Sequence, residues 1–261
     1  MVSSRLPRLA LCLIVVLIGG CSPRYSVIPE PLRLTATVHE LIGRLDQRTR
    51  SIQTLKALVT IRSERQPAVT ASLSFSRSVD GGPPSLRLKG FDPLGRTLFD
   101  LISVGDQARL TIPREGRVLE SGPDKPDDPS LLLHTAELRL ALSALVGPFV
   151  EHGEIPVIER TGATYLIHLV RISGAEGRLT KRLWFERSHL TLKREELFKG
   201  KDEAETVVEF YDYRSLSGID WPGRITITRR QDEFHEESRV TLEFREVHPN
   251  AVISPEEFKI P

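Results

Sequence analysis

Seven histidines are spread along the chain, and their spacing bears on whether the protein could hold a metal. No two of them have the spacing of a zinc motif, and the segment around His235 (FHEES) is not the H-E-x-x-H motif of metalloproteases. The signatures of nucleophilic serines, phosphate-binding loops and dinucleotide-binding turns are also missing from the sequence. The sequence therefore predicts a protein that is not an enzyme and that uses no metal and no cofactor.

Adjacent carboxylates occur three times, and such pairs could serve acid–base chemistry. They are Asp127-Asp128, Glu195-Glu196 and Glu236-Glu237. We interpret them as solvated faces of loops or strands. Folding could still bring two distant carboxylates together, so catalysis is disfavoured rather than excluded.

The segment Leu86–Arg96 has a more unusual pattern. Its centre, Asp92–Gly95, has the residues of a type I turn, with Asp first, Pro second and Gly fourth. The third position places Leu94 at the tip, with Arg87 and Lys89 nearby to meet anionic headgroups. The candidate membrane-insertion residues are Phe91, Pro93, Leu94 and Arg96. An ordinary hairpin whose leucine folds back onto the sheet fits the residues equally well.

The N-terminus has the pattern of an export signal. Arg5 and Arg8 precede an apolar run, Leu9–Ile18, which is too short for a bilayer that needs about 20 apolar residues. Ile18–Cys21 resembles the lipobox of bacterial lipoproteins, whose cysteine is acylated. We therefore expect lipidation of Cys21, and the alternative is a plain signal peptide. Ser22 after the cysteine implies, by resemblance to Gram-negative sorting, the outer membrane.

Composition limits the remaining possibilities. The 261 residues are 39% hydrophobic and 27% charged, which suits one globular domain. Removing Arg5 and Arg8 from the 36 basic residues leaves 34 against 35 acidic ones, so the mature net charge is −1. This balance argues against nucleic acid as a partner. We predict a signal peptide over 1–20, a lipid-anchored tether over 21–33, and one domain over 34–261.

Two helices are expected in this domain. The first begins with a capping box at Thr37 and Glu40, and its apolar stripe is Val38, Leu41, Ile42 and Leu45. The second runs over 135–146 and is apolar on nearly every side, so it is either core or a lid over a cavity.

Most of the domain has the alternating pattern of strands. From Leu55 the period is two, and Val69–Ser76 alternates apolar residues with hydroxyls. Further strands are expected at 97–104, 107–113, 116–121, 154–160, 163–173, 179–187, 190–198, 204–214, 223–230 and 236–247. Their short links require antiparallel pairing. The fold class is therefore mainly β (α+β), an antiparallel half-barrel of about 10–12 strands with an N-terminal helix and a second, lid-like helix.

These features together resemble a known family. The anchored cysteine, the N-terminal helix and the segments LRLKGFDPLGRTLFDLISVGDQARLTI and LWFERSHLTLKREELFKGKDEAETVVEFYDYRSLSGIDWPGRITIT look like LolA/LolB-like outer-membrane lipoproteins, especially the LolB-type lipoprotein receptor. The resemblance implies a hydrophobic half-barrel that accepts acyl chains, with a protruding leucine, here Leu94, that helps insert lipoproteins. The chain is longer than a typical LolB, so the alternative is a lipoprotein of LolA-like fold with another function in the cell envelope.

The resemblance also implies partners and a location. We expect a monomer on the periplasmic face of the bacterial outer membrane, with lipoprotein or lipid cargo and a periplasmic carrier. The candidate acyl-chain cavity residues, chosen from alternation and from the second helix, are Val69, Leu73, Phe75, Leu138, Leu142, Leu145, Ile225 and Ile227. Each of them could equally be plain core. The alternative function is a non-catalytic structural or adaptor lipoprotein with a filled interior.

Overall fold

The computed structural model describes residues 34–64, 67–77, 83–122, 145, 147, 149–174, 176–200, 203–231 and 236–260. The predicted signal peptide, Cys21 and the tether lie outside these residues, as do Leu138 and Leu142 of the predicted second helix. The chain divides into two units, Met1–Leu32 and Arg33–Pro261, and every described helix and strand belongs to the second.

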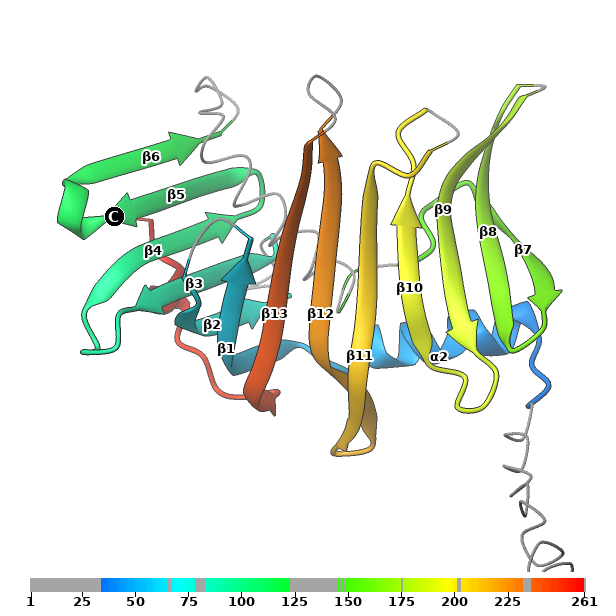
Figure 1. Cartoon of the computed structure of the whole chain (residues 1–261), viewed down its shortest axis with the longest axis horizontal. Coiled ribbons are helices and arrows are strands. Elements are labelled where there is room, and N and C mark those ends of the chain that lie inside the picture. Colours follow the sequence, from blue (N-terminus) through cyan, green and yellow to red (C-terminus); the bar gives the residue numbers. More distant parts are fainter. Residues whose placement is uncertain are drawn as a thin grey trace, which may run out of the picture. The chain divides into compact units, whose positions relative to one another are not determined.

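One antiparallel sheet forms the framework of this unit (Figure 1). Its thirteen strands are ordered β6-β5-β4-β3-β2-β1-β13-β12-β11-β10-β9-β8-β7. Their bounds are β1 Thr54–Ser63, β2 Val69–Ser76, β3 Ser85–Phe91, β4 Thr97–Val104, β5 Gln107–Ile112, β6 Arg117–Ser121, β7 Glu154–Thr161, β8 Thr164–Ser173, β9 Glu176–Glu186, β10 Leu192–Leu197, β11 Thr206–Leu216, β12 Ile219–Gln231 and β13 Glu236–Pro249. Short 3-10 turns occur at Pro113–Glu115 and Pro255–Phe258. The sheet stays open because β6 and β7 form its two edges.

This architecture confirms the predicted fold class, a mainly β half-barrel with an N-terminal helix. The short links predicted antiparallel pairing, and each neighbouring pair in the sheet is antiparallel. The sheet has thirteen strands where the alternation suggested about 10–12. Of the predicted lid-like helix over 135–146, only Leu145 belongs to the described residues, and its side chain is fully buried.

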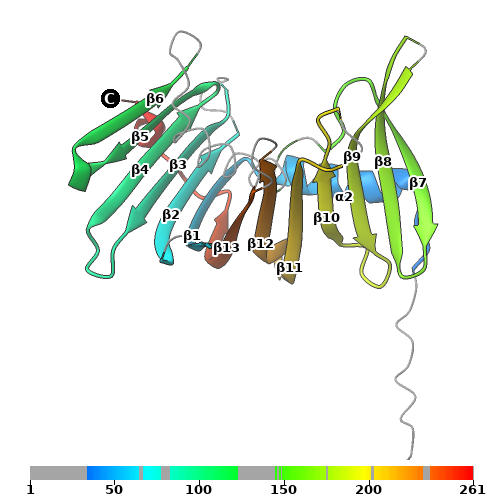
Figure 2. The same cartoon turned by 45° about the horizontal axis from the view of Figure 1, so that its top comes forward.

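The helix α2 (Val38–Ser51) starts where the capping box predicted it. The Thr37 hydroxyl accepts a hydrogen bond from the Glu40 N–H at 3.2 Å, and the Glu40 carboxylate accepts one from the Thr37 N–H at 2.7 Å. The buried side chains of Leu41 and Leu45 belong to the apolar core. Figures 1 and 2 show α2 lying across β7 to β11 on one face of the sheet.

Tyr165 on β8 fixes the approach to α2. Its hydroxyl donates to the carbonyl of Leu34 and accepts from the N–H of Ala36, both at 2.9 Å. The ring is fully buried, so the two hydrogen bonds satisfy a polar tip that would otherwise be costly to bury. The start of the helix is thereby held against the sheet. No helix in the described part of the chain is long and apolar enough to cross a membrane.

Candidate functional site

The turn between β3 and β4 has the predicted conformation. The N–H of Gly95 donates to the carbonyl of Asp92 at 2.9 Å, which closes the four-residue turn. Gly95 has φ of +79°, a backbone conformation that favours glycine. Leu94 does not fold back onto the sheet, because 78% of its surface is exposed. The leucine therefore protrudes as the insertion hypothesis requires, and the membrane-insertion role itself stays a prediction.

Asp92 is the organising residue of this turn. One oxygen of its carboxylate accepts from the N–H groups of Leu94 and Arg96, each at 2.9 Å. The other oxygen contacts the guanidinium groups of Arg96 at 2.8 Å and Arg114 at 2.7 Å. These contacts, foremost the hydrogen bond from the Arg96 N–H, lower the pKa of Asp92. The carboxylate therefore holds the leucine tip in one conformation.

The other cations near the tip have protein partners of their own. Arg87 pairs with both oxygens of Asp100 on β4, at 2.9 and 2.6 Å. The Lys89 ammonium lies over the Phe91 ring, 5.9 Å from its centroid. Pro93 is exposed beside Leu94. Of the candidate insertion residues, Pro93, Leu94 and Arg96 are thus exposed in the turn, and Phe91 is half-buried at the end of β3.

The described candidates for an acyl-chain cavity mostly lie inside one core cluster. Leu73, Phe75, Ile225 and Ile227 are buried there, and Leu145 joins them. Val69 is only half-buried at the start of β2. Alternation thus identified the inward face of β2 and β12 correctly, whereas a cavity role for these residues stays a prediction.

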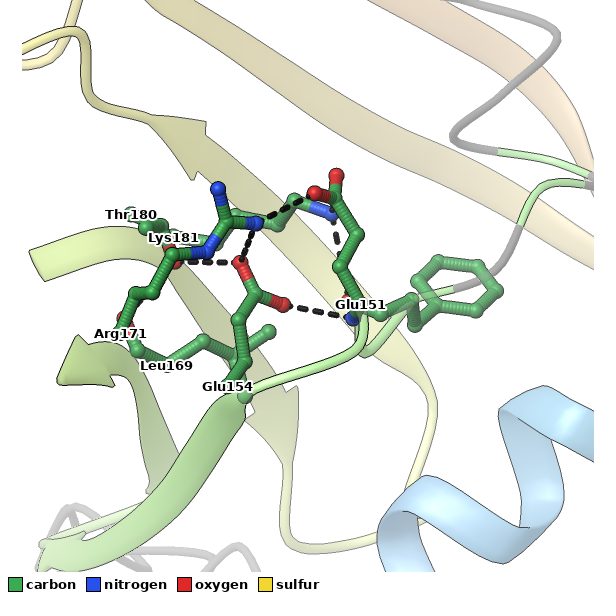
Figure 3. A network of polar contacts seen from close by, with 7 residues as sticks. Glu151, Glu154, Leu169, Arg171, Thr180 and Lys181 are labelled. Atoms are coloured by element: carbon green, nitrogen blue, oxygen red, sulfur yellow. Dashed lines mark hydrogen bonds and ion pairs between the residues drawn. The ribbon is translucent and has the colours of Figure 1, made fainter. Parts of the chain in front are cut away.

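A second cluster, not identified from the sequence, surrounds Glu154 at the start of β7 (Figure 3). The Glu154 carboxylate is 1% exposed and accepts from the Thr180 hydroxyl at 2.6 Å and from the Glu151 N–H at 2.7 Å. Lys181 lies 3.2 Å from the Glu151 carboxylate, and Arg171 approaches it to 2.6 Å. Coulombic attraction by Lys181 lowers the pKa of Glu151 more than any other contact.

An irregularity in the sheet creates this cluster. The register of β8 and β9 shifts between Leu169 and Val170, which leaves Thr180 as an extra residue on β9. Its hydroxyl can therefore reach Glu154, and its single proton is shared between that carboxylate at 2.6 Å and the Leu169 carbonyl at 3.0 Å. A bulge of one residue leaves no signal in the alternation of the sequence, so pattern analysis could not find it.

The cluster borders a pocket of about 500 Å³, here called the Glu154 pocket. Its lining residues are Glu151, Glu154, Arg171, Ser173, Arg178, Thr180, Lys181, Leu197 and Phe198. Three cations and two carboxylates therefore face one space, next to two apolar side chains. Within the described ranges no group of three or more His, Cys, Asp or Glu side chains is arranged to hold a metal ion.

The interpretation of Glu195 and Glu196 as a solvated strand face was wrong. Glu195 is 5% exposed and Glu196 is 7% exposed, on a strand, β10, that lies inside the sheet between β9 and β11. Glu196 pairs with Arg194 at 2.8 Å, whereas one oxygen of Glu195 has no hydrogen-bond partner among the described residues. Desolvation raises the pKa of Glu195, against the attraction of Lys181 and Arg48.

Comparison with known proteins gives matches in structure but not in sequence. No protein-family model matches the sequence, and no curated protein matches it either. A domain assigned to outer membrane lipoprotein sorting from Vibrio parahaemolyticus superposes with a TM-score of 0.54 at 12% identity, over 84% of this chain and 94% of that one.

Two further solved structures agree with the first. A DUF1329 family protein from Desulfovibrio piger has a TM-score of 0.53 at 15% identity, over 85% of this chain and 95% of that one. A LolA superfamily protein from Nitrosomonas europaea has a TM-score of 0.51 at 9% identity, over 87% of this chain and 99% of that one. At these identities the likeness is one of fold, and it extends over nearly the whole of each compared chain.

Proposed function

We propose, from the LolA-like fold of this chain and from its Leu94 hairpin, a non-catalytic lipoprotein of the bacterial outer membrane that handles acylated cargo. In this proposal Cys21 carries the lipid anchor, and the half-barrel binds acyl chains of a lipoprotein or lipid. The Leu94 hairpin then touches the bilayer while the cargo is delivered. A solved neighbour assigned to lipoprotein sorting and another of the LolA superfamily support this choice.

The exposure of Leu94 is the observation that carries the proposal. Leaving a leucine 78% exposed gives up the stabilisation of burying it in the protein, about 1.5–3 kcal/mol for a full side chain. The same free energy becomes available when the side chain enters the acyl region of a bilayer. This free energy is enough for a transient contact with the bilayer and too little for an anchor. It suits a side chain that must leave the bilayer after delivery.

The substitution Leu94→Glu tests the proposal. We expect the variant to fold with unchanged stability, because the side chain has few contacts to lose, and to fail in delivering lipoproteins to outer-membrane vesicles. Val252→Glu is a matched control, since Val252 is 94% exposed but lies away from the hairpin in the sequence. Normal delivery by the Leu94→Glu variant would refute the insertion role.

A structural or adaptor role is the second candidate, and one observation favours it. The described candidates on the inward face are nearly all buried side chains of a single core. A filled interior would leave the fold as an interaction surface for another envelope assembly. The two functions differ in whether the purified protein contains lipid.

A further inference from the structure

Two arginines face each other across β8 and β9. Arg171 and Arg178 are direct cross-strand partners in the antiparallel register, and both line the Glu154 pocket. Side chains in such positions have Cβ atoms about 4.5–5.5 Å apart, and like charges placed there repel. Elsewhere the sheet sets opposite charges face to face, as with Arg230 and Glu237 or Arg109 and Glu120.

Among the described residues, carboxylates pair with only one of these two arginines. Arg171 pairs with Glu151 at 2.6 Å and lies 3.7 Å from Glu154. Arg178 has no hydrogen-bond or ion-pair partner among the described residues. Its guanidinium lies against Gly200, where a Cβ would come within 2.7 Å of a guanidinium nitrogen. Glycine at this position therefore lets an unpaired cation rest at the pocket.

The two carboxylates of the pocket do not supply the missing anion. Glu154 is 1% exposed, and its oxygens already accept from Thr180 and from the Glu151 N–H. Glu151 is shared between Arg171 and Lys181. With three cations against two carboxylates, the pocket keeps a net positive charge.

We propose that the Glu154 pocket binds the phosphate group of an organic ligand, held between Arg171 and Arg178. The guanidinium fork matches the oxygens of phosphate in a bidentate way, and two neighbouring forks suit a group with several acceptor oxygens. The apolar wall of Leu197 and Phe198 would contact the organic part. The volume of about 500 Å³ is typical of small-molecule sites and far exceeds what bare phosphate needs. This site is separate from acyl-chain binding in the core.

Calorimetric titration of the full chain in a neutral glycoside detergent tests the proposal. The probes are inorganic phosphate and dihexanoylphosphatidic acid, a short-chain phospholipid. We expect Arg178→Gln to weaken binding about tenfold or more, since it removes a charged hydrogen-bond donor. Glu151→Gln should strengthen binding several-fold, because it removes a competing anion. Arg160→Gln, which changes an exposed arginine of β7 outside the pocket, should leave affinity unchanged.

The two probes distinguish the source of the phosphate. Tighter binding of the phospholipid would support a lipid headgroup as the source, and equal binding would support the anion alone and count against a role for the apolar wall. Two results would overturn the proposal: no binding of either probe by the unmodified chain, or equal affinities for the unmodified chain and Arg178→Gln. The opposite effect expected for Glu151→Gln keeps the proposal testable if Arg178→Gln folds poorly. None of these variants alters the Leu94 hairpin, so failure here leaves the delivery role to be judged separately.

Discussion

At the scale of single residues, Glu195 shows how position in a sheet overrides residue type. It is adjacent to Glu196 on β10, yet the two side chains face opposite sides of the strand. Glu196 has Arg194 as a partner, whereas Glu195 points to the side where Lys181, Arg48 and Glu154 supply the nearest charges. Desolvation is the largest influence on Glu195 and raises its pKa.

This raised pKa predicts how stability depends on pH. The folded protein holds the Glu195 proton more tightly than the unfolded chain, which releases it near the ordinary pKa of 4.5. Below that pH the carboxyl is protonated in both states, so it does not lower the stability of the fold. As pH rises toward the folded-state pKa, the unfolded chain loses the proton first, and the free energy of unfolding falls until the folded protein is ionised as well. We expect Glu195→Gln to raise the free energy of unfolding by about 1 kcal/mol at neutral pH.

Urea denaturation from acidic to neutral pH checks this prediction. The difference between Glu195→Gln and the unmodified protein should vanish at acidic pH and grow toward neutrality. Glu196→Gln is the matched control, and it should destabilise the protein because Arg194 and Arg182 lose a carboxylate at 2.8 and 3.7 Å. A Glu195→Gln variant that is less stable than the unmodified protein at neutral pH would contradict the assignment.

At the scale of elements, the β3–β4 hairpin depends on a close contact between Gly90 and Phe99. The two residues are direct partners, and a Cβ on Gly90 would lie 2.3 Å from the Phe99 ring. We expect Gly90→Ala to lower the free energy of unfolding by about 1–3 kcal/mol through overpacking.

In α2, Gly43→Ala should raise the free energy of unfolding by up to about 1 kcal/mol. Outside its own stretch of helix, no atom would lie within 4 Å of the added Cβ.

Thermal unfolding of both glycine variants, together with Gly90→Ala/Phe99→Leu, measures the contact. The double variant should recover part of the stability lost by Gly90→Ala, because the smaller side chain makes room for the new methyl group. A Gly90→Ala variant that is as stable as the unmodified protein would show that the hairpin does not depend on the close contact between Gly90 and the Phe99 ring.

The sequence was most informative about the bounds of helices, strands and turns. The capping box located the start of α2, and β4 begins and ends at the predicted residues 97 and 104. The turn residues Asp92–Gly95 predicted the hairpin but left open whether its leucine protrudes, which the structure shows. The Glu154 pocket was not predictable, because it needs a bulge at Thr180 and side chains from four strands. Alternation gives the face of a residue within its strand but not its neighbours across a bulge.

At the scale of the whole domain, the order of strands shows a constraint that no single element reveals. β1 pairs with both β2 and β13, so the first and last strands of the chain lie side by side in the middle of the sheet. β6 and β7, consecutive in the sequence, form opposite edges. The chain between Ser121 and Glu154 must therefore connect one edge of the sheet to the other. Leu145 and Phe149 in this connection are buried in the core cluster.

The connection bears on whether the interior can hold acyl chains. Leu145 and Phe149 share one core with inward-facing residues of the sheet such as Leu73 and Ile225. If the domain carries lipid, a chain should occupy space among such residues and remain bound after purification. We expect mass spectrometry of protein purified without a tag, with Cys21→Ser to prevent acylation, to detect acyl-chain lipids at close to one per molecule. Protein that contains no lipid, and takes up none from vesicles, would favour the adaptor role, in which the same side chains fill the interior and the fold acts through its surface.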